Sequence, residues 1–199
     1  MVKVNIKEIV ENLIFSFLYA GKVSLDLRDK GLIKKIKEDN TPVTNGDLEV
    51  NKIITKKIAE LAPSIPIISE ENSENKTINN LKDFWLIDPI DGTHDYISDM
   101  DEFTINAGLI FNNKPVAGLI YAPAKKRMFF SFGINQAFEL INGKSIKLNP
   151  TRNFKKDNIS FVSYSNKIKP EIEKIHKKLN VKKITRMKSS LKFCVIAAG

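Results

Sequence analysis

The chain has 199 residues, of which 42% are hydrophobic and 28% charged, and its formal net charge at pH 7 is +9. This length and apolar content allow a sizeable core in one large or two small domains, and they exclude a disordered or fibrous chain. The basic residues are nearly all lysines spread along the sequence, without an arginine cluster, so we expect no sequence-specific nucleic-acid binding.

Two amphipathic helices are predicted in the first third of the chain. Residues 5–22 carry apolar side chains at helical spacing, and Gly21 is typical of a helix end, although one or two further turns through Leu25 remain open. A charged stretch, residues 34–40, precedes the second helical pattern, which begins after Thr44 and ends at Pro63. Asp47 lies in the first turn of that helix, where a carboxylate ordinarily serves as a cap.

Two buried strands are predicted to end in acidic residues. Ile67-Ile68-Ser69 is followed by Glu70 and Glu71, and Trp85-Leu86-Ile87 is followed by Asp88, Pro89 and Asp91. Because proline has no N–H and holds its neighbour extended, we expect the second strand to stop near Asp88. If the strands are adjacent and end at the same edge, Glu70, Asp88 and Asp91 surround one point. Three carboxylates there would repel one another, so the sequence predicts a cation, and hard oxygen ligands favour Mg²⁺.

A period of two replaces the helical period after residue 103. Residues 104–111, 116–121, 127–132 and 137–140 are predicted strands, and Asn112-Asn113 and Asn142-Gly143 are predicted hairpin turns. We expect an antiparallel or mixed sheet packed on the two N-terminal helices. His94, just after the acidic segment, is predicted to lie at the surface or beside a phosphate and not to act as the general acid.

The last quarter of the chain has a β-α-β-α order. A polar stretch after Pro150 suggests a boundary between an α+β domain, residues 1–150, and the start of an α/β domain, residues 151–199. Strands are predicted at residues 159–162 and 182–184, with helices at residues 169–179 and from Ser189 to Ala198. The single cysteine, Cys194, and the absence of a signal-peptide pattern or of an apolar run of about 20 residues favour a cytoplasmic protein, with peripheral attachment at the inner membrane as an option.

Three segments resemble the signature of the inositol monophosphatase superfamily, which comprises Mg²⁺-dependent, lithium-sensitive phosphatases. They are residues 42–47, 69–71 and 85–93, in the family's order and spacing. The resemblance implies a layered αβαβα sugar-phosphatase fold and hydrolysis of a phosphomonoester by metal-activated water. It also implies roles for individual residues: Glu70, Asp88, Asp91 and the Ile90 carbonyl bind two or three Mg²⁺ ions and the substrate; Asp47 and the Thr93 hydroxyl orient the attacking water; and the backbone of Gly92 and Thr93 holds the phosphate.

Within this superfamily the chain is most similar to the 3'(2'),5'-bisphosphate nucleotidases of the CysQ type. That similarity lies in residues 37–44, 102–106, 114–118, 121–123 and 189–194. It implies adenosine 3',5'-bisphosphate, or 3'-phosphoadenylyl sulfate, as substrate. It further implies that Ser189 and Lys192 contact the substrate, and that Lys37 and Asp39 belong to a mobile loop that closes over the metal ions.

Two departures from the family pattern leave other functions open. The sequence stops at Gly199, before a Trp-Asp segment whose aspartate is a further metal ligand in relatives, so an incomplete second domain and an inactive, truncated remnant that binds metal or a partner are alternatives. Residues 163–166 read Ser-Tyr-Ser-Asn, where nucleotidases often carry Ser-Arg-Ser-His. An inositol monophosphatase or a sugar phosphatase like fructose-1,6-bisphosphatase is therefore the enzymatic alternative. Relatives include monomers and dimers, so a homodimer is an option.

Overall fold

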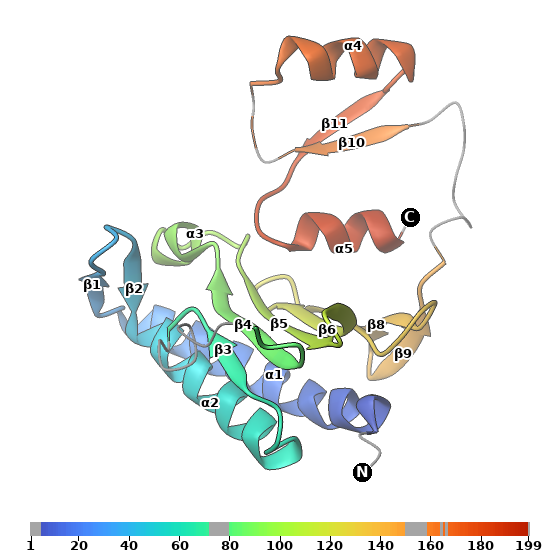
Figure 1. Cartoon of the computed structure of the whole chain (residues 1–199). Coiled ribbons are helices and arrows are strands. Elements are labelled where there is room, and N and C mark those ends of the chain that lie inside the picture. Colours follow the sequence, from blue (N-terminus) through green and yellow to red (C-terminus); the bar gives the residue numbers. More distant parts are fainter. Residues whose placement is uncertain (1–4, 72–79, 150–158, 164, 166, 199) are drawn as a thin grey trace.

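A seven-stranded mixed sheet with helices on both faces forms the framework of the protein (Figure 1). The structure is a computed structural model that describes residues 5–71, 80–149, 159–163, 165 and 167–198. Strand order in the sheet follows chain order, β3-β4-β5-β6-β7-β8-β9, and every neighbouring pair is antiparallel except β3 and β4, which are parallel. The expected mixed sheet is thus confirmed.

The strands of this sheet have the following bounds: β3 Ile67–Ser69, β4 Phe84–Asp91, β5 Thr104–Phe111, β6 Lys114–Ala122, β7 Arg127–Ser131, β8 Ala137–Ile141 and β9 Lys144–Lys147. The four strands predicted after residue 103 are confirmed within two residues at each end, whereas β9 was not predicted. Both predicted hairpin turns are also confirmed: Asn112, Asn113 and Asn142 adopt the positive φ values that these turns require, as does Gly143.

Helices α1 (Ile6–Lys30) and α2 (Asn45–Leu61) pack side by side on one face of the sheet. Their apolar stripes, with Leu13, Phe17 and Ile54 fully buried, meet the inward side chains of β4 and β6 in one continuous core. Burying one such side chain contributes about 1.5–3 kcal/mol, so this helix pair holds the central strands in place. Between the two helices, β1 (Lys34–Ile36) and β2 (Pro42–Thr44) form an antiparallel hairpin within the charged stretch.

The expectation that Gly21 ends the first helix is wrong. Helix α1 continues to Lys30 and ends at Gly31, whose φ is +97°. Gly21 is buried inside the helix because the ring of Tyr121 and Pro123 lie where its Cβ would stand. The glycine therefore permits close helix–sheet packing and does not act as a helix stop.

The C-terminal segments lie on the opposite face of the sheet (Figure 1). Strands β10 (Ser160–Ser163) and β11 (Lys183–Arg186) form a parallel pair, and helix α4 (Pro170–Lys178) lies between them in the sequence. This arrangement confirms the β-α-β-α order. Helix α5 (Leu191–Ala198) packs on β6 and β7 through Leu191 and Cys194, both buried. The domain boundary expected near residue 150 falls almost wholly outside the described residues. In the described part of the chain, no helix is long and apolar enough to cross a membrane.

Candidate active site

The predicted edge of acidic residues forms because β3 and β4 are neighbours that run in the same direction. Ile67, Ile68 and Ser69 pair with Trp85, Leu86 and Ile87, and the ladder closes with the Glu70 N–H donating to the Ile87 carbonyl at 3.1 Å. Both strands therefore deliver their acidic residues to the same edge of the sheet. This juxtaposition of Glu70 with Asp88 and Asp91 agrees with the expectation from the sequence.

The expectation that β4 stops near Asp88 is wrong, since the strand continues to Asp91. Pro89 is tolerated because the pairing with β3 has already ended at Ile87, so its missing N–H breaks no bond on that side. On the other side, Asp88 pairs with Asn106 and Asp91 with Thr104, so β4 carries one extra residue there. Residues three apart in a regular strand face opposite sides of a sheet, and this bulge lets both carboxylates serve one site.

Asp88 is the most strongly perturbed acid of the site. Its Oδ1 is buried and has no hydrogen-bond partner. Burial, together with the nearby carboxylates of Asp91 and Glu70, raises the pKa of Asp88 to about 7. Among the described residues, no basic side chain forms an ion pair with this half-buried acid. The donor chemistry of the site, carboxylate and carbonyl oxygens, fits a hard cation such as Mg²⁺.

Groups of the protein itself occupy part of this acidic edge. The Lys37 ammonium, from the turn between β1 and β2, donates to Glu71 Oε1 at 2.6 Å and to Glu70 Oε1 at 3.1 Å. The Ser190 N–H donates to Asp91 Oδ2 at 2.6 Å. With these contacts in place, no three acidic, histidine or cysteine side chains in the described ranges form a preassembled metal cage.

Asp47 has two roles in the structure, because it caps α2 and also contacts Thr93. Its Oδ2 accepts from the Thr44 N–H at 2.8 Å and from the Thr44 hydroxyl at 2.6 Å, which completes a capping box. Its Oδ1 accepts from the Thr93 hydroxyl at 3.3 Å, while the same hydroxyl lies 3.1 Å from the Ile90 carbonyl. Asp47 is only 2% exposed, and burial raises its pKa.

Gly92 forms the link between β4 and the short helix α3 (Thr93–Ile97). It adopts a left-handed conformation with φ +96°, and a Cβ there would stand 3.0 Å from the Glu102 carbonyl oxygen. Helix α3 is fixed at its far end by Tyr96, whose hydroxyl donates to the Ser24 carbonyl of α1 at 2.6 Å. Thr93 is thereby held between a strand, a tight turn and a helix anchored to the core.

The remaining predicted residues lie beside this edge or point away from it. His94 is 83% exposed and lies 3.6 Å from Asp95, so it faces solvent. Ser189 is buried, and its Oγ accepts from the Leu191 N–H at 3.4 Å. The Lys192 ammonium donates to the Ser189 carbonyl at 2.6 Å, so in this structure it points back to its own turn.

Two residues near the acidic edge, Ser190 and Lys188, had no role assigned from the sequence. Ser190 bonds to Asp91, and the Lys188 ammonium donates to the buried Asp95 of α3 at 2.6 Å. The serine pair at residues 189–190 was part of the family motif, but no sequence pattern indicated which of its atoms would reach the acids. Such long-range pairings are visible only once the chain is folded.

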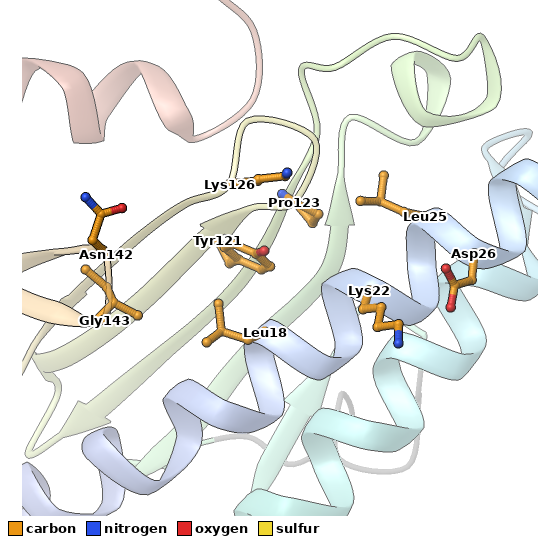
Figure 2. A pocket seen from close by; sticks show the side chains of 10 residues that line it. Leu18, Lys22, Leu25, Asp26, Tyr121, Pro123, Lys126, Asn142 and Gly143 are labelled. Carbon is orange, nitrogen blue, oxygen red and sulfur yellow. The ribbon is translucent and has the colours of Figure 1, made fainter.

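A cavity of about 400 Å³ lies elsewhere, between α1 and the ends of β6 and β8. Figure 2 shows its side chains: Leu18, Lys22 and Leu25 lie on α1, opposite Tyr121 and Pro123. None of the predicted site residues lines this cavity. Its charged groups are two lysines and one aspartate, so it lacks the cluster of acids that a divalent cation needs.

The layers of the fold and the site together define a layered α/β protein with a carboxylate site suited to a divalent cation. The chain belongs to the inositol monophosphatase family, whose sequence pattern matches residues 8–199. It is 40% identical over 165 residues to the 3'(2'),5'-bisphosphate nucleotidase CysQ of Buchnera aphidicola, and this match covers 82% of the chain and 61% of that relative's length.

Two solved structures have the same fold. CysQ from Bacteroides thetaiotaomicron is 26% identical, with a TM-score of 0.69 over 96% of this chain and 76% of that one. An IMPase/NADP phosphatase, solved with Mg²⁺ and phosphate, is 18% identical, with a TM-score of 0.72 over 98% of this chain and 72% of that one. The layered fold expected from the family resemblance is confirmed.

Proposed function

We propose that this protein is a Mg²⁺-dependent phosphomonoesterase that removes the 3'-phosphate of adenosine 3',5'-bisphosphate. The observation that carries the proposal is the convergence of Glu70, Asp88 and Asp91 at the ends of two parallel strands, with Asp88 half-buried and its buried Oδ1 without a hydrogen-bond partner. Family membership, the nucleotidase relative and the phosphatase solved with Mg²⁺ and phosphate support the same reaction class.

The metal ligands in this proposal are the carboxylates of Glu70, Asp88 and Asp91 and the carbonyl of Ile90, which would hold two or three Mg²⁺ ions. Mg²⁺ in such a site acts as a Lewis acid toward the phosphoryl oxygens and makes water easier to deprotonate. Two contacts must change before all these oxygens can face a cation. Lys37 must leave Glu70, and the Thr93 hydroxyl must release the Ile90 carbonyl.

Asp47 and Thr93 orient the attacking water. The Thr93 hydroxyl donates its proton to Asp47 Oδ1. The lone pairs of the Thr93 oxygen are then free to accept from a water molecule on the side of Asp88 and Asp91. A raised pKa suits Asp47 to receive a proton through Thr93. The left-handed turn at Gly92 keeps the backbone bare of side chain where the transferring phosphate would bind.

Ser189 and Lys192 are the proposed contacts for the rest of the substrate. Lys192 already lies at the start of α5, and its ammonium would turn from the Ser189 carbonyl to the phosphate that is not cleaved. The substrate could also be 3'-phosphoadenylyl sulfate, which carries the same 3'-phosphate. Inositol monophosphate or a fructose bisphosphate is the second candidate, favoured by the loss of arginine and histidine from residues 163–166.

The test measures phosphate release from adenosine 3',5'-bisphosphate, inositol 1-phosphate and fructose 1,6-bisphosphate, with and without Mg²⁺ and with added lithium. We expect Mg²⁺-dependent, lithium-inhibited turnover with a preference for the nucleotide. Asp91→Asn should abolish both turnover and Mg²⁺ binding by calorimetry, whereas the matched control His94→Ala should keep most of both. Equal losses in the two variants would contradict the assignment.

The same experiment separates the enzyme from an inactive relative. The chain spans 61% of the length of the Buchnera relative, so a protein that binds Mg²⁺ but releases no phosphate from any of the three substrates would support a metal-binding remnant. Recovery of turnover on addition of a relative's C-terminal segment would then identify this chain as the metal-binding part of a longer enzyme. Absence of both binding and turnover would overturn the proposal. The homodimer that the family resemblance allows is testable by sedimentation.

A further inference from the structure

The turn between β11 and α5 crosses the acidic edge and reaches it through Ser190. The Ser190 N–H donates to Asp91 Oδ2 at 2.6 Å, and its hydroxyl donates to Asn106 Oδ1 at 2.7 Å. The same hydroxyl oxygen lies 2.8 Å from the Thr104 hydroxyl. Because a serine hydroxyl has one proton, which Asn106 receives, Thr104 is the donor in the remaining bond. Ser190 thus donates one hydrogen bond through its N–H, and its hydroxyl donates one and accepts one.

The two partners of the Ser190 hydroxyl are the residues that pair with the metal-site acids across the sheet. Thr104 is the register partner of Asp91, and Asn106 is the register partner of Asp88. Thr104 is also fully buried, so its position is set by the core. The hydroxyl is therefore anchored on β5 directly opposite the bulge in β4, and this anchor fixes the direction in which the Ser190 N–H points.

We propose that Ser190 is a positioning residue that holds the Asp91 carboxylate in the orientation needed to bind Mg²⁺. Its N–H engages Oδ2 and fixes the rotation of the carboxylate, so that Oδ1 faces the ion. Asp91 is a metal ligand only if the proposed phosphatase function holds, and the inference rests on that function. Partners that orient metal ligands typically contribute about 10–100-fold to metal affinity or activity.

The turn has a second attachment that does not involve Ser190. The Lys188 N–H donates to Glu102 Oε2 at 2.9 Å, and its ammonium donates to Asp95 Oδ1 at 2.6 Å. Asp95 is 3% exposed, so this charge pair is a firm anchor for the turn. Loss of the Ser190 hydroxyl should leave the turn docked and change only the aim of the N–H.

The test compares Ser190→Ala with Ser190→Thr, which keeps the hydroxyl, and with Ser145→Ala, a serine on the exposed strand β9. Mg²⁺ binding is measured by calorimetry without substrate, followed by the rate of phosphate release against Mg²⁺ concentration. We expect Ser190→Ala to bind Mg²⁺ about tenfold more weakly and to recover its rate at high Mg²⁺, with KM for the nucleotide unchanged. The Mg²⁺ affinity and the rate of phosphate release of Ser190→Thr and Ser145→Ala should stay within about twofold of those of the parent protein.

The outcomes separate the two proposals. If Ser190→Ala binds Mg²⁺ as tightly as the parent protein, the positioning role is wrong, while the phosphatase function stands on the parent's own binding and turnover. If the parent protein binds no Mg²⁺, both proposals are overturned. If Ser190→Ala does not fold, Thr104→Val removes one of the two anchors with nearly unchanged shape and is measured in the same way. Unaltered Mg²⁺ affinity in a folded Thr104→Val protein would then refute the positioning role.

Discussion

Asp47→Asn should separate the capping role of Asp47 in α2 from its proposed role in the site. The carboxylate accepts two hydrogen bonds from Thr44 at Oδ2 and one from Thr93 at Oδ1. An asparagine has a single acceptor oxygen, so it can serve Thr44 or Thr93 but not both. The choice between these two orientations determines what the variant does.

The costs of the lost hydrogen bonds favour the orientation in which the asparagine oxygen still accepts both hydrogen bonds from Thr44. Turning the amide NH₂ toward Thr44 would leave a buried backbone donor without a partner, at a cost of about 1–3 kcal/mol, whereas losing the longer bond from Thr93 costs about 1 kcal/mol. The NH₂ group then faces the Thr93 hydroxyl and donates to it. The Thr93 hydroxyl then keeps only the Ile90 carbonyl as acceptor, and the proposed route for a proton from water to Asp47 is broken.

We therefore expect a large loss of rate with a small loss of stability. Phosphate release from adenosine 3',5'-bisphosphate should fall by about 10²–10⁴-fold, the usual contribution of a general base. The free energy of unfolding should change by less than about 1 kcal/mol, which is a shift in melting temperature of less than about 4 °C for a chain of this size. Thermal denaturation followed by circular dichroism checks the second value.

Two further variants complete this test. Glu60→Gln makes the same chemical change at the exposed end of the same helix and should alter neither quantity. Thr93→Val removes the donor of the hydrogen bond that Asp47→Asn breaks at the acceptor. The two variants therefore lose the same interaction, and their losses of rate should not add. A rate above a tenth of the parent value in Asp47→Asn, or additive losses in the double variant, would refute the reasoning.

Other contacts give independent predictions. Lys37→Met removes the ammonium that donates to Glu70, a proposed metal ligand, and to Glu71, so calorimetry should find Mg²⁺ binding about fivefold tighter; weaker binding would mean that the lysine supports the site. Arg127→Lys loses the paired hydrogen bonds to buried Glu139, and urea denaturation should find a loss of about 1–2 kcal/mol; an unchanged midpoint would contradict this. Burial raises the pKa of Cys194 from 9.0 to about 12, which lowers its thiolate fraction at pH 8 about a thousandfold; rapid reaction of the folded protein with a disulfide reagent would argue against such burial.

The parts of the fold that the sequence predicted well depend on local signals. The hairpins at Asn112-Asn113 and at Asn142-Gly143 carry their own turn chemistry, and the strands beside them alternate with a period of two. The acidic edge was predictable for a similar reason, since each of two apolar runs ends in its own acids. Only the adjacency of β3 and β4 had to be assumed.

The predictions that were wrong or missing depend on partners far away in the sequence. Gly21 resembles a helix stop until Tyr121, a hundred positions later, occupies the space beside it. Pro89 suggests the end of a strand unless the neighbouring strand is known to finish first. The contact of Ser190 with Asp91 spans 99 positions and begins at a backbone N–H, which every residue except proline possesses. No residue type or spacing could have indicated it.

The long separation between Ser190 and Asp91 also bears on how the protein is made. Asp47, the acids of the edge and Thr93 all lie within the first 93 residues, so they leave the ribosome early, and domains generally fold as units from the N-terminus. Ser190, the residue proposed to orient Asp91, is translated about a hundred codons after it. If the acidic edge forms before Ser190 is made, the proposal predicts that the Asp91 carboxylate of such a nascent chain is not yet oriented.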